Sequence, residues 1–138
     1  MLKIEHRQLH RPNGLIDDFV LYGEPIDYTA FADKVEAAIK SKVAETLQTG
    51  SRIQIEVLNV SGQRELFTSL QNKDDCYLSM EDWQQRDILR VFGSTAVLEQ
   101  LRQFLMDLSG RGQGYSYISE YSAGRSYSTS SPEWRLHL

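Results

Sequence analysis

Apolar and charged residues alternate at the start of the chain, where Leu2 and Ile4 are interleaved with charged side chains. A period of two residues places successive side chains on opposite faces, so residues 2–9 are predicted to form a β-strand. The sequence Pro-Asn-Gly that follows has the chemistry of a turn. A second strand is expected around residues 19–22, although the pattern before it is irregular.

The same period of two residues marks further strands in the middle of the chain. Residues 53–57 alternate isoleucine and valine with polar side chains, and residues 88–93 form an apolar run that ends at a glycine. After a Ser-Gly turn, residues 63–70 are expected to return antiparallel to residues 53–57. Residues 76–87 are ambiguous between a short strand and a helical turn.

Apolar residues at three- and four-residue steps predict two helices. Residues 27–50 form the first, with Asp27 or Thr29 as its cap and Gly50 at its end. Residues 94–112 form the second, capped by Ser94 or Thr95. The buried stripes are expected to be Phe31, Val35, Ala38, Ile39, Val43 and Leu47 in the first helix, and Val97, Leu98, Leu101, Phe104, Leu105 and Leu108 in the second.

The order of these elements is strands, helix, several strands, helix and two strands. Consecutive strands between helices are typical of the α+β class, with both helices packed on one face of a mostly antiparallel sheet. A length of 138 residues suits one domain, and no linker interrupts the pattern. We therefore expect a single α+β domain over residues 1–138.

The composition narrows the classes of partner and compartment. The formal net charge is −4 and lysine and arginine are scattered, which argues against a nucleic-acid or anionic-membrane surface and suits a basic partner. One cysteine cannot build a disulfide framework or a cysteine-based metal site. No segment resembles a signal peptide or a membrane span, so the expected location is the cytoplasm.

No motif in the sequence indicates catalysis, a metal or a cofactor. The glycines of "SGRGQG" follow a helix and precede a strand, the reverse of the order that a dinucleotide-binding loop requires. Four acidic residues lie near one another in the sequence, but their spacing is not that of a calcium-binding loop: Asp74, Asp75, Glu81 and Asp82. They form either a solvated acidic surface or a surface that steers a basic partner. We expect no enzyme activity, no cofactor and no metal.

The last residues, "YSYISEY" and "EWRLHL", are unusually rich in aromatic side chains. Tyr115, Tyr117 and Tyr121 share one face of a predicted strand. Trp134 and Leu136 share one face of the next strand, opposite Glu133, Arg135 and His137. Two interpretations are open: the tyrosines join Trp134 and Leu136 in the core, or they form a partly exposed patch that anchors a partner.

The segment "DILRVFGSTAVLEQLRQFLMDLSGRGQGYSYISEY", followed by "SPEWRLHL", resembles bacterial polymorphic-toxin immunity proteins of the immunity protein 32 type. The shared features are a strand ending in glycine, a leucine-rich helix, a strand, and a final strand after a serine-bearing turn. The resemblance covers about the C-terminal third. The family has histidines in the strand after the helix. Here those positions are Tyr115 and Tyr117, so no role of such histidines carries over.

The resemblance implies a protein that makes no covalent change but binds and neutralises a cognate toxin domain. Many such toxins are basic nucleases, which an acidic inhibitor would attract. On this hypothesis Asp74, Asp75, Glu81 and Asp82 steer the toxin, while Trp83, Tyr121 and Tyr127 anchor it. The alternatives are a small enzyme with a pocket between helices and sheet, or an adaptor that dimerises through an edge strand such as residues 133–138. The protein would be a monomer or a homodimer.

Overall fold

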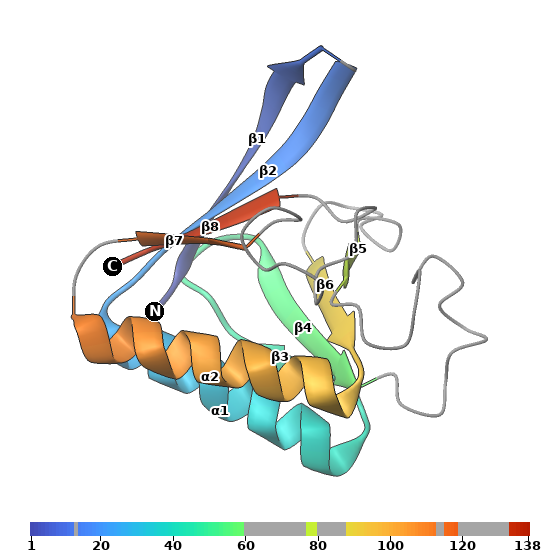
Figure 1. Ribbon diagram of the computed structural model, residues 1–138, viewed down its shortest axis with the longest axis vertical. Coiled ribbons are helices and arrows are strands. Elements are labelled where there is room, and N and C mark those ends of the chain that lie inside the picture. The colour runs from blue at the N-terminus through green and yellow to red at the C-terminus, as the bar shows by residue number, and fades with distance from the viewer. Residues whose placement is uncertain (13, 60–76, 80–87, 113–114, 119–132) are drawn as a thin grey trace.

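A computed structural model describes residues 1–12, 14–59, 77–79, 88–112, 115–118 and 133–138 of the chain. Within these ranges two helices pack against two small sheets (Figure 1). The predicted α+β class, with helices packed on a mostly antiparallel sheet, is confirmed. The strands are divided between two sheets, which the sequence pattern alone does not show.

Sheet A contains the strands at both ends of the chain. They are β1 (Lys3–Arg11), β2 (Gly14–Tyr22), β7 (Tyr115–Ile118) and β8 (Glu133–His137), in the order β1-β2-β8-β7. β1 and β2 form a long antiparallel hairpin, β8 pairs with β2 in parallel, and β7 pairs antiparallel with β8. The distal ends of β1 and β2 project well beyond the helices and the other strands (Figure 1).

Sheet B contains the strands from the middle of the chain. They are β3 (Glu45–Leu47), β4 (Gln54–Asn59), β5 (Tyr77–Ser79) and β6 (Ile88–Gly93), in the order β3-β4-β6-β5. β4 and β6 are parallel, and the two outer pairings are antiparallel. Residues 63–70, predicted to pair with β4, lie outside the described residues.

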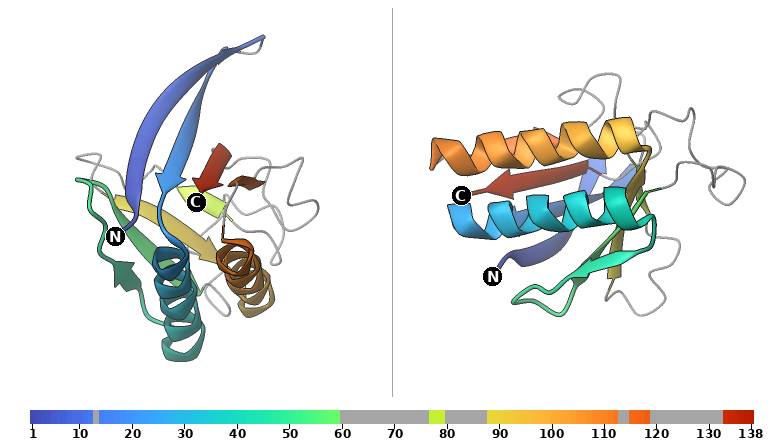
Figure 2. Two further views of the ribbon diagram at one scale, coloured as in Figure 1. Left: turned by 90° about the vertical axis from the view of Figure 1, so that its left-hand side faces the viewer. Right: turned by 90° about the horizontal axis from the view of Figure 1, so that it is seen from below.

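Helices α1 (Pro25–Ser41) and α2 (Thr95–Arg111) lie side by side beneath the sheets (Figures 1 and 2). The start of α1 meets the end of α2, because the Ser109 hydroxyl donates to the carbonyl of Pro25 at 2.9 Å and lies 2.9 Å from the Thr29 hydroxyl. At the other end, the buried Asn59 amide donates to the Ile39 carbonyl and to the Thr95 hydroxyl. These polar contacts fix how the helices sit against β4.

The apolar residues of both sheets and both helices form one core. Its fully buried large side chains include Phe19, Leu21, Tyr28, Phe31, Ile55, Leu89, Leu98, Leu105, Leu108 and Leu136. The predicted stripe of α2 is confirmed, with Phe104 only partly buried against this core. Ser94 caps α2 as predicted, its hydroxyl accepting from the Val97 amide at 3.3 Å, and Gly112 ends the helix at φ 75°.

The limits predicted for the first helix were wrong at both ends. α1 begins at Pro25, whose missing N–H and fixed φ suit the first turn, and the Glu24 amide donates to Asp27 at 2.8 Å. It ends at Ser41, because Lys42 adopts a left-handed conformation and the chain then forms β3. Val43 is therefore 58% exposed. Val43 and Leu47 have the spacing of a helix, but the backbone is extended at residues 45–47 because β3 pairs with β4.

Tyr28 connects α1 to the two strands in the middle of sheet A. Its ring is fully buried, and its hydroxyl lies within hydrogen-bonding reach of the carbonyls of Leu21 in β2 and His137 in β8. The Gly23 amide also donates to the His137 carbonyl, at 3.1 Å. Burial raises the pKa of Tyr28 above its ordinary range, so the hydroxyl keeps its proton and remains a donor.

Tyr28→Phe removes this hydroxyl without changing the volume of the ring. We expect the free energy of unfolding to fall by about 1–2 kcal/mol, since buried carbonyls lose a donor. Urea denaturation measures it, with Tyr22→Phe as the matched control because Tyr22 is 41% exposed. Equal, small effects of the two substitutions would show that the Tyr28 hydroxyl does not stabilise the fold.

Candidate functional site

The two faces of sheet A differ in character. Leu2, Ile4, Leu21 and Leu136 belong to the core, and the helices cover that face. The alternate positions of the same strands point away from the helices, because successive side chains in a strand lie on opposite sides. We call this second side the outer face.

Strand register fixes which residues are neighbours across the outer face. Three rows run across the sheet from β1 towards β7, each joined by the printed pairings of neighbouring strands. The rows are Lys3–Tyr22–His137–Tyr115, then Glu5–Val20–Arg135–Tyr117, then Arg7–Asp18–Glu133. Aromatic, basic and acidic positions are thus collected from strands at the two ends of the chain.

This register decides between the two interpretations of the tyrosines. Tyr115 and Tyr117 occupy positions opposite His137 and Arg135, on the outer face. The positions that pair on the core side are Ser116 with Leu136 and Ile118 with Trp134. The interpretation that places the tyrosines beside Leu136 was therefore wrong for Tyr115 and Tyr117, and the interpretation as an aromatic patch fits these two positions. Tyr121 lies outside the described residues.

The described side chains of the outer face differ in exposure: Lys3, Glu5 and Tyr22 are exposed, whereas the other described positions are half-buried or buried. The rings of Tyr22 and His137 are in contact, with centroids 5.3 Å apart. The Nε atoms of Arg7 and Arg135 are buried, so these side chains do not extend fully into solvent. Val20, which is outside the core cluster, is only 1% exposed. Tyr22 remains 41% exposed and is the accessible aromatic ring of this group.

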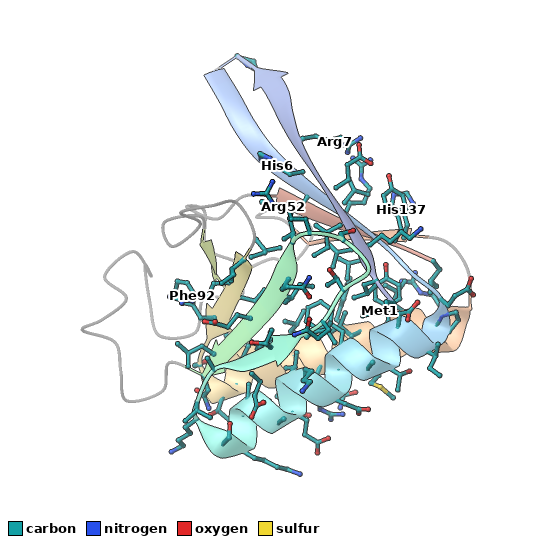
Figure 3. All side chains as sticks on the ribbon, turned by 180° about the vertical axis from the view of Figure 1, so that it is seen from behind. Met1, His6, Arg7, Arg52, Phe92 and His137 are labelled. Carbon is teal, nitrogen blue, oxygen red and sulfur yellow. The ribbon has the colours of Figure 1, made fainter. Side chains whose placement is uncertain are left out.

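Figure 3 shows the contrast between neighbouring residues of β1. Arg7 lies on the same side of the hairpin as His137, whereas His6 lies on the other side. The His6 ring stacks on Phe19, with centroids 5.0 Å apart. The two histidines therefore belong to different environments.

The basic groups of the outer face affect one another. Partial burial of His137 lowers its pKa, and the positive charges of Arg135 and Arg7 lower it further. The imidazole is therefore neutral at pH 7. A neutral ring can both donate and accept hydrogen bonds, and it contacts Tyr22 without adding a positive charge to those of Arg7 and Arg135.

The outer side of sheet B offers less accessible surface. Phe92 lies outside the core cluster but is only 2% exposed. Arg90 and Glu56, on neighbouring strands, form an ion pair at 2.8 Å. Of the two sheets, the described residues of sheet A therefore present the better candidate for a binding surface.

None of the site residues predicted from the sequence can be placed. Asp74, Asp75, Glu81, Asp82, Trp83, Tyr121 and Tyr127 all lie outside the described residues. The sequence interpretation did not select Arg7, Tyr22, Arg135 or His137 as site residues. The alternation in "LKIEHRQL" and "EWRLHL" already placed Arg7, Arg135 and His137 on polar faces, but only the pairing of β2 with β8 joins those faces.

The suggestion that residues 133–138 form an edge strand, through which an adaptor could dimerise, was wrong. β8 lies between β2 and β7, so both of its sides are paired. The outer strands of sheet A are β1 and β7.

Comparisons with protein-family models, with curated proteins and with solved structures found no match for this chain. In the part of the chain that the structure describes, neither helix is both long and apolar enough to cross a membrane. Among those same residues, no three His, Cys, Asp or Glu side chains gather in a way that could hold a metal ion.

His137→Gln should make the stability of the protein less sensitive to acid. Because the pKa of His137 is lower in the folded chain than its unfolded value of about 6.5, the unfolded chain binds a proton first as the pH falls. This contribution to stability is complete above the unfolded pKa and is lost towards the folded pKa. Urea midpoints measured between about pH 7.5 and about pH 5.5 should therefore fall more in the wild type than in the variant.

A direct titration of the imidazole by NMR provides the check on this expectation. A pKa for His137 at or above about 6.5 in the folded protein would contradict it.

Proposed function

We propose that this protein acts by binding another protein, and that it is an immunity-type protein that neutralises a cognate toxin domain without catalysis. The observation that carries the proposal is the outer face of sheet A, where tyrosine, arginine and histidine positions are collected on paired strands. Tyrosine and arginine are enriched among residues that contribute most to protein–protein binding.

The packing of side chains on this face supports a role in recognition. Tyr22 is exposed but its ring contacts His137, and the buried Nε atoms of Arg7 and Arg135 show that these side chains are already partly ordered. A partner that binds ordered side chains loses less conformational freedom on association, which favours slow dissociation. The mixed charges of Glu5, Arg7 and Arg135 suit a protein partner better than a polyanion.

A toxin as the partner is supported by the resemblance of the C-terminal third of the chain to toxin immunity proteins. The elements on which that resemblance rests correspond to β6, which ends at Gly93, the leucine-rich α2, β7 and β8. Two of these elements, β7 and β8, are strands of sheet A and contribute residues to the outer face. The predicted acidic residues Asp74, Asp75, Glu81 and Asp82 would steer a basic toxin towards the protein.

The test starts with the reading frame next to the gene for this chain. Its product, expressed alone in a bacterial host, should arrest growth, and co-expression of this protein should restore growth and yield a stable complex. A neighbouring product that is harmless, or a toxin that this protein neither binds nor silences, would contradict the proposed function.

The complex then allows the outer face to be tested with matched variants. Tyr22→Ala should weaken binding to the toxin by about 1–3 kcal/mol, measured by calorimetry, because an exposed aromatic anchor is removed. Met106→Ala is the control, since Met106 is 40% exposed and belongs to α2, which packs on the core face of sheet A rather than on the outer face. Equal losses for the two variants, or none for Tyr22→Ala, would exclude this face as the binding surface.

A further inference from the structure

The first row of the outer face, Lys3–Tyr22–His137–Tyr115, contains no acidic position. Lys3 and Tyr22 are cross-strand partners in this row, and both side chains are exposed. Side chains directly opposite each other on an antiparallel pair start about 5 Å apart, so the ends of two long side chains can reach one point above the sheet. The accessible part of the row is therefore a pair of neighbouring donors, an ammonium and a phenol hydroxyl.

Neither donor is used within the part of the chain that the structure describes. Lys3 forms no ion pair there, although the exposed Glu5 lies two positions along the same face of β1. The Tyr22 hydroxyl makes no hydrogen bond there, while its ring contacts the His137 ring. The Lys3 Cγ lies close to Gly50, and because the residue is exposed, the flexible stem beyond that atom can turn towards Tyr22. Both donors are thus available to a ligand.

The charges that act on this part of the outer face favour a negative ligand group. The positive charges of Arg135 and Arg7 reach the His137 ring, which lies against Tyr22 with centroids 5.3 Å apart. A ligand group beside Tyr22 experiences these charges and that of Lys3, whose Cα is paired with Tyr22 in the register.

We propose that Lys3 and Tyr22 together bind one carboxylate of the partner, supplied by an aspartate or glutamate side chain of the toxin. The inference rests on the proposed function and names the chemical group that this end of the outer face recognises. A carboxylate has two oxygens, so it accepts from the Lys3 ammonium and from the Tyr22 hydroxyl at the same time. Hydrogen bonds to an ionised acceptor are shorter and stronger than those between neutral groups.

A carboxylate is favoured over the phosphates of a nucleic acid, which present the same kind of acceptor oxygen. Binding of a polyanion needs several basic residues in succession, whereas Glu5 follows Lys3 on the same face and is exposed. The formal net charge of −4 also repels a polyanion. A single acidic side chain needs only the two donors.

Matched variants of this protein test the inference on the toxin encoded by the neighbouring reading frame. Lys3→Met keeps the apolar stem and Tyr22→Phe keeps the ring, and each should weaken binding about tenfold in calorimetry because a donor to a charged group is lost. Lys40→Met on α1 is the control for the loss of an exposed lysine, and it should change the affinity less than about twofold. Circular dichroism confirms that each variant is folded.

The carboxylate is identified from the other side of the complex. Each surface Asp or Glu of the toxin is replaced in turn by Asn or Gln, and one replacement should weaken binding about tenfold. Combined with Lys3→Met, that replacement should cost less than the product of the two single losses, because both remove the same contact. Independent losses for every acidic residue of the toxin would overturn the inference.

The outcomes distinguish this inference from the proposed function. A toxin that binds the wild type, Lys3→Met and Tyr22→Phe equally well would overturn the carboxylate contact and leave the immunity function intact. The absence of any toxin partner would overturn both. Binding of a single-stranded oligonucleotide that weakens with Lys3→Met would show that these donors take phosphates, and would also overturn the carboxylate contact.

Discussion

The parallel pairing of β2 with β8 is the contact on which the rest of the structure depends. It joins the strand near the start of the chain to the last strand, and it is held at one end by the Tyr28 hydroxyl and the Gly23 amide, which share the His137 carbonyl. With Leu21 opposite Leu136, the core residues of both strands face the helices. The positions between them then form the outer face, so one register sets both the core and the proposed binding surface.

Much of the local structure could be predicted from the residues alone. The helical stripe of α2, its Ser94 cap and its glycine end depend on interactions within about one turn of the helix, which sequence spacing reports directly. The alternation in β1, β4 and β8 likewise separates buried from polar positions, because the period of two is a property of each strand by itself.

The pairing of distant strands could not be predicted in the same way. Alternation shows that Arg7 and His137 lie on polar faces but not that those faces join, since this depends on contacts between residues far apart in the sequence. The sequence predicted a first helix that is too long for a similar reason. Val43 and Leu47 fit helical spacing, but Leu47 is buried because β3 pairs with β4, which the spacing does not reveal. The two interpretations of the tyrosines stayed open at the level of sequence because the sequence does not reveal the register of β7 against β8.

The most direct test of this account is the register of β2 against β8, measured by nuclear Overhauser effects in the isotope-labelled protein. The account predicts contacts between the methyl groups of Val20 and the protons of Arg135, and between Leu21 and Leu136 on the opposite face. A slip of one residue would exchange the two faces of β8. Contacts of Val20 with Leu136 in place of Arg135 would contradict the account, because Arg135 and His137 would then face the core.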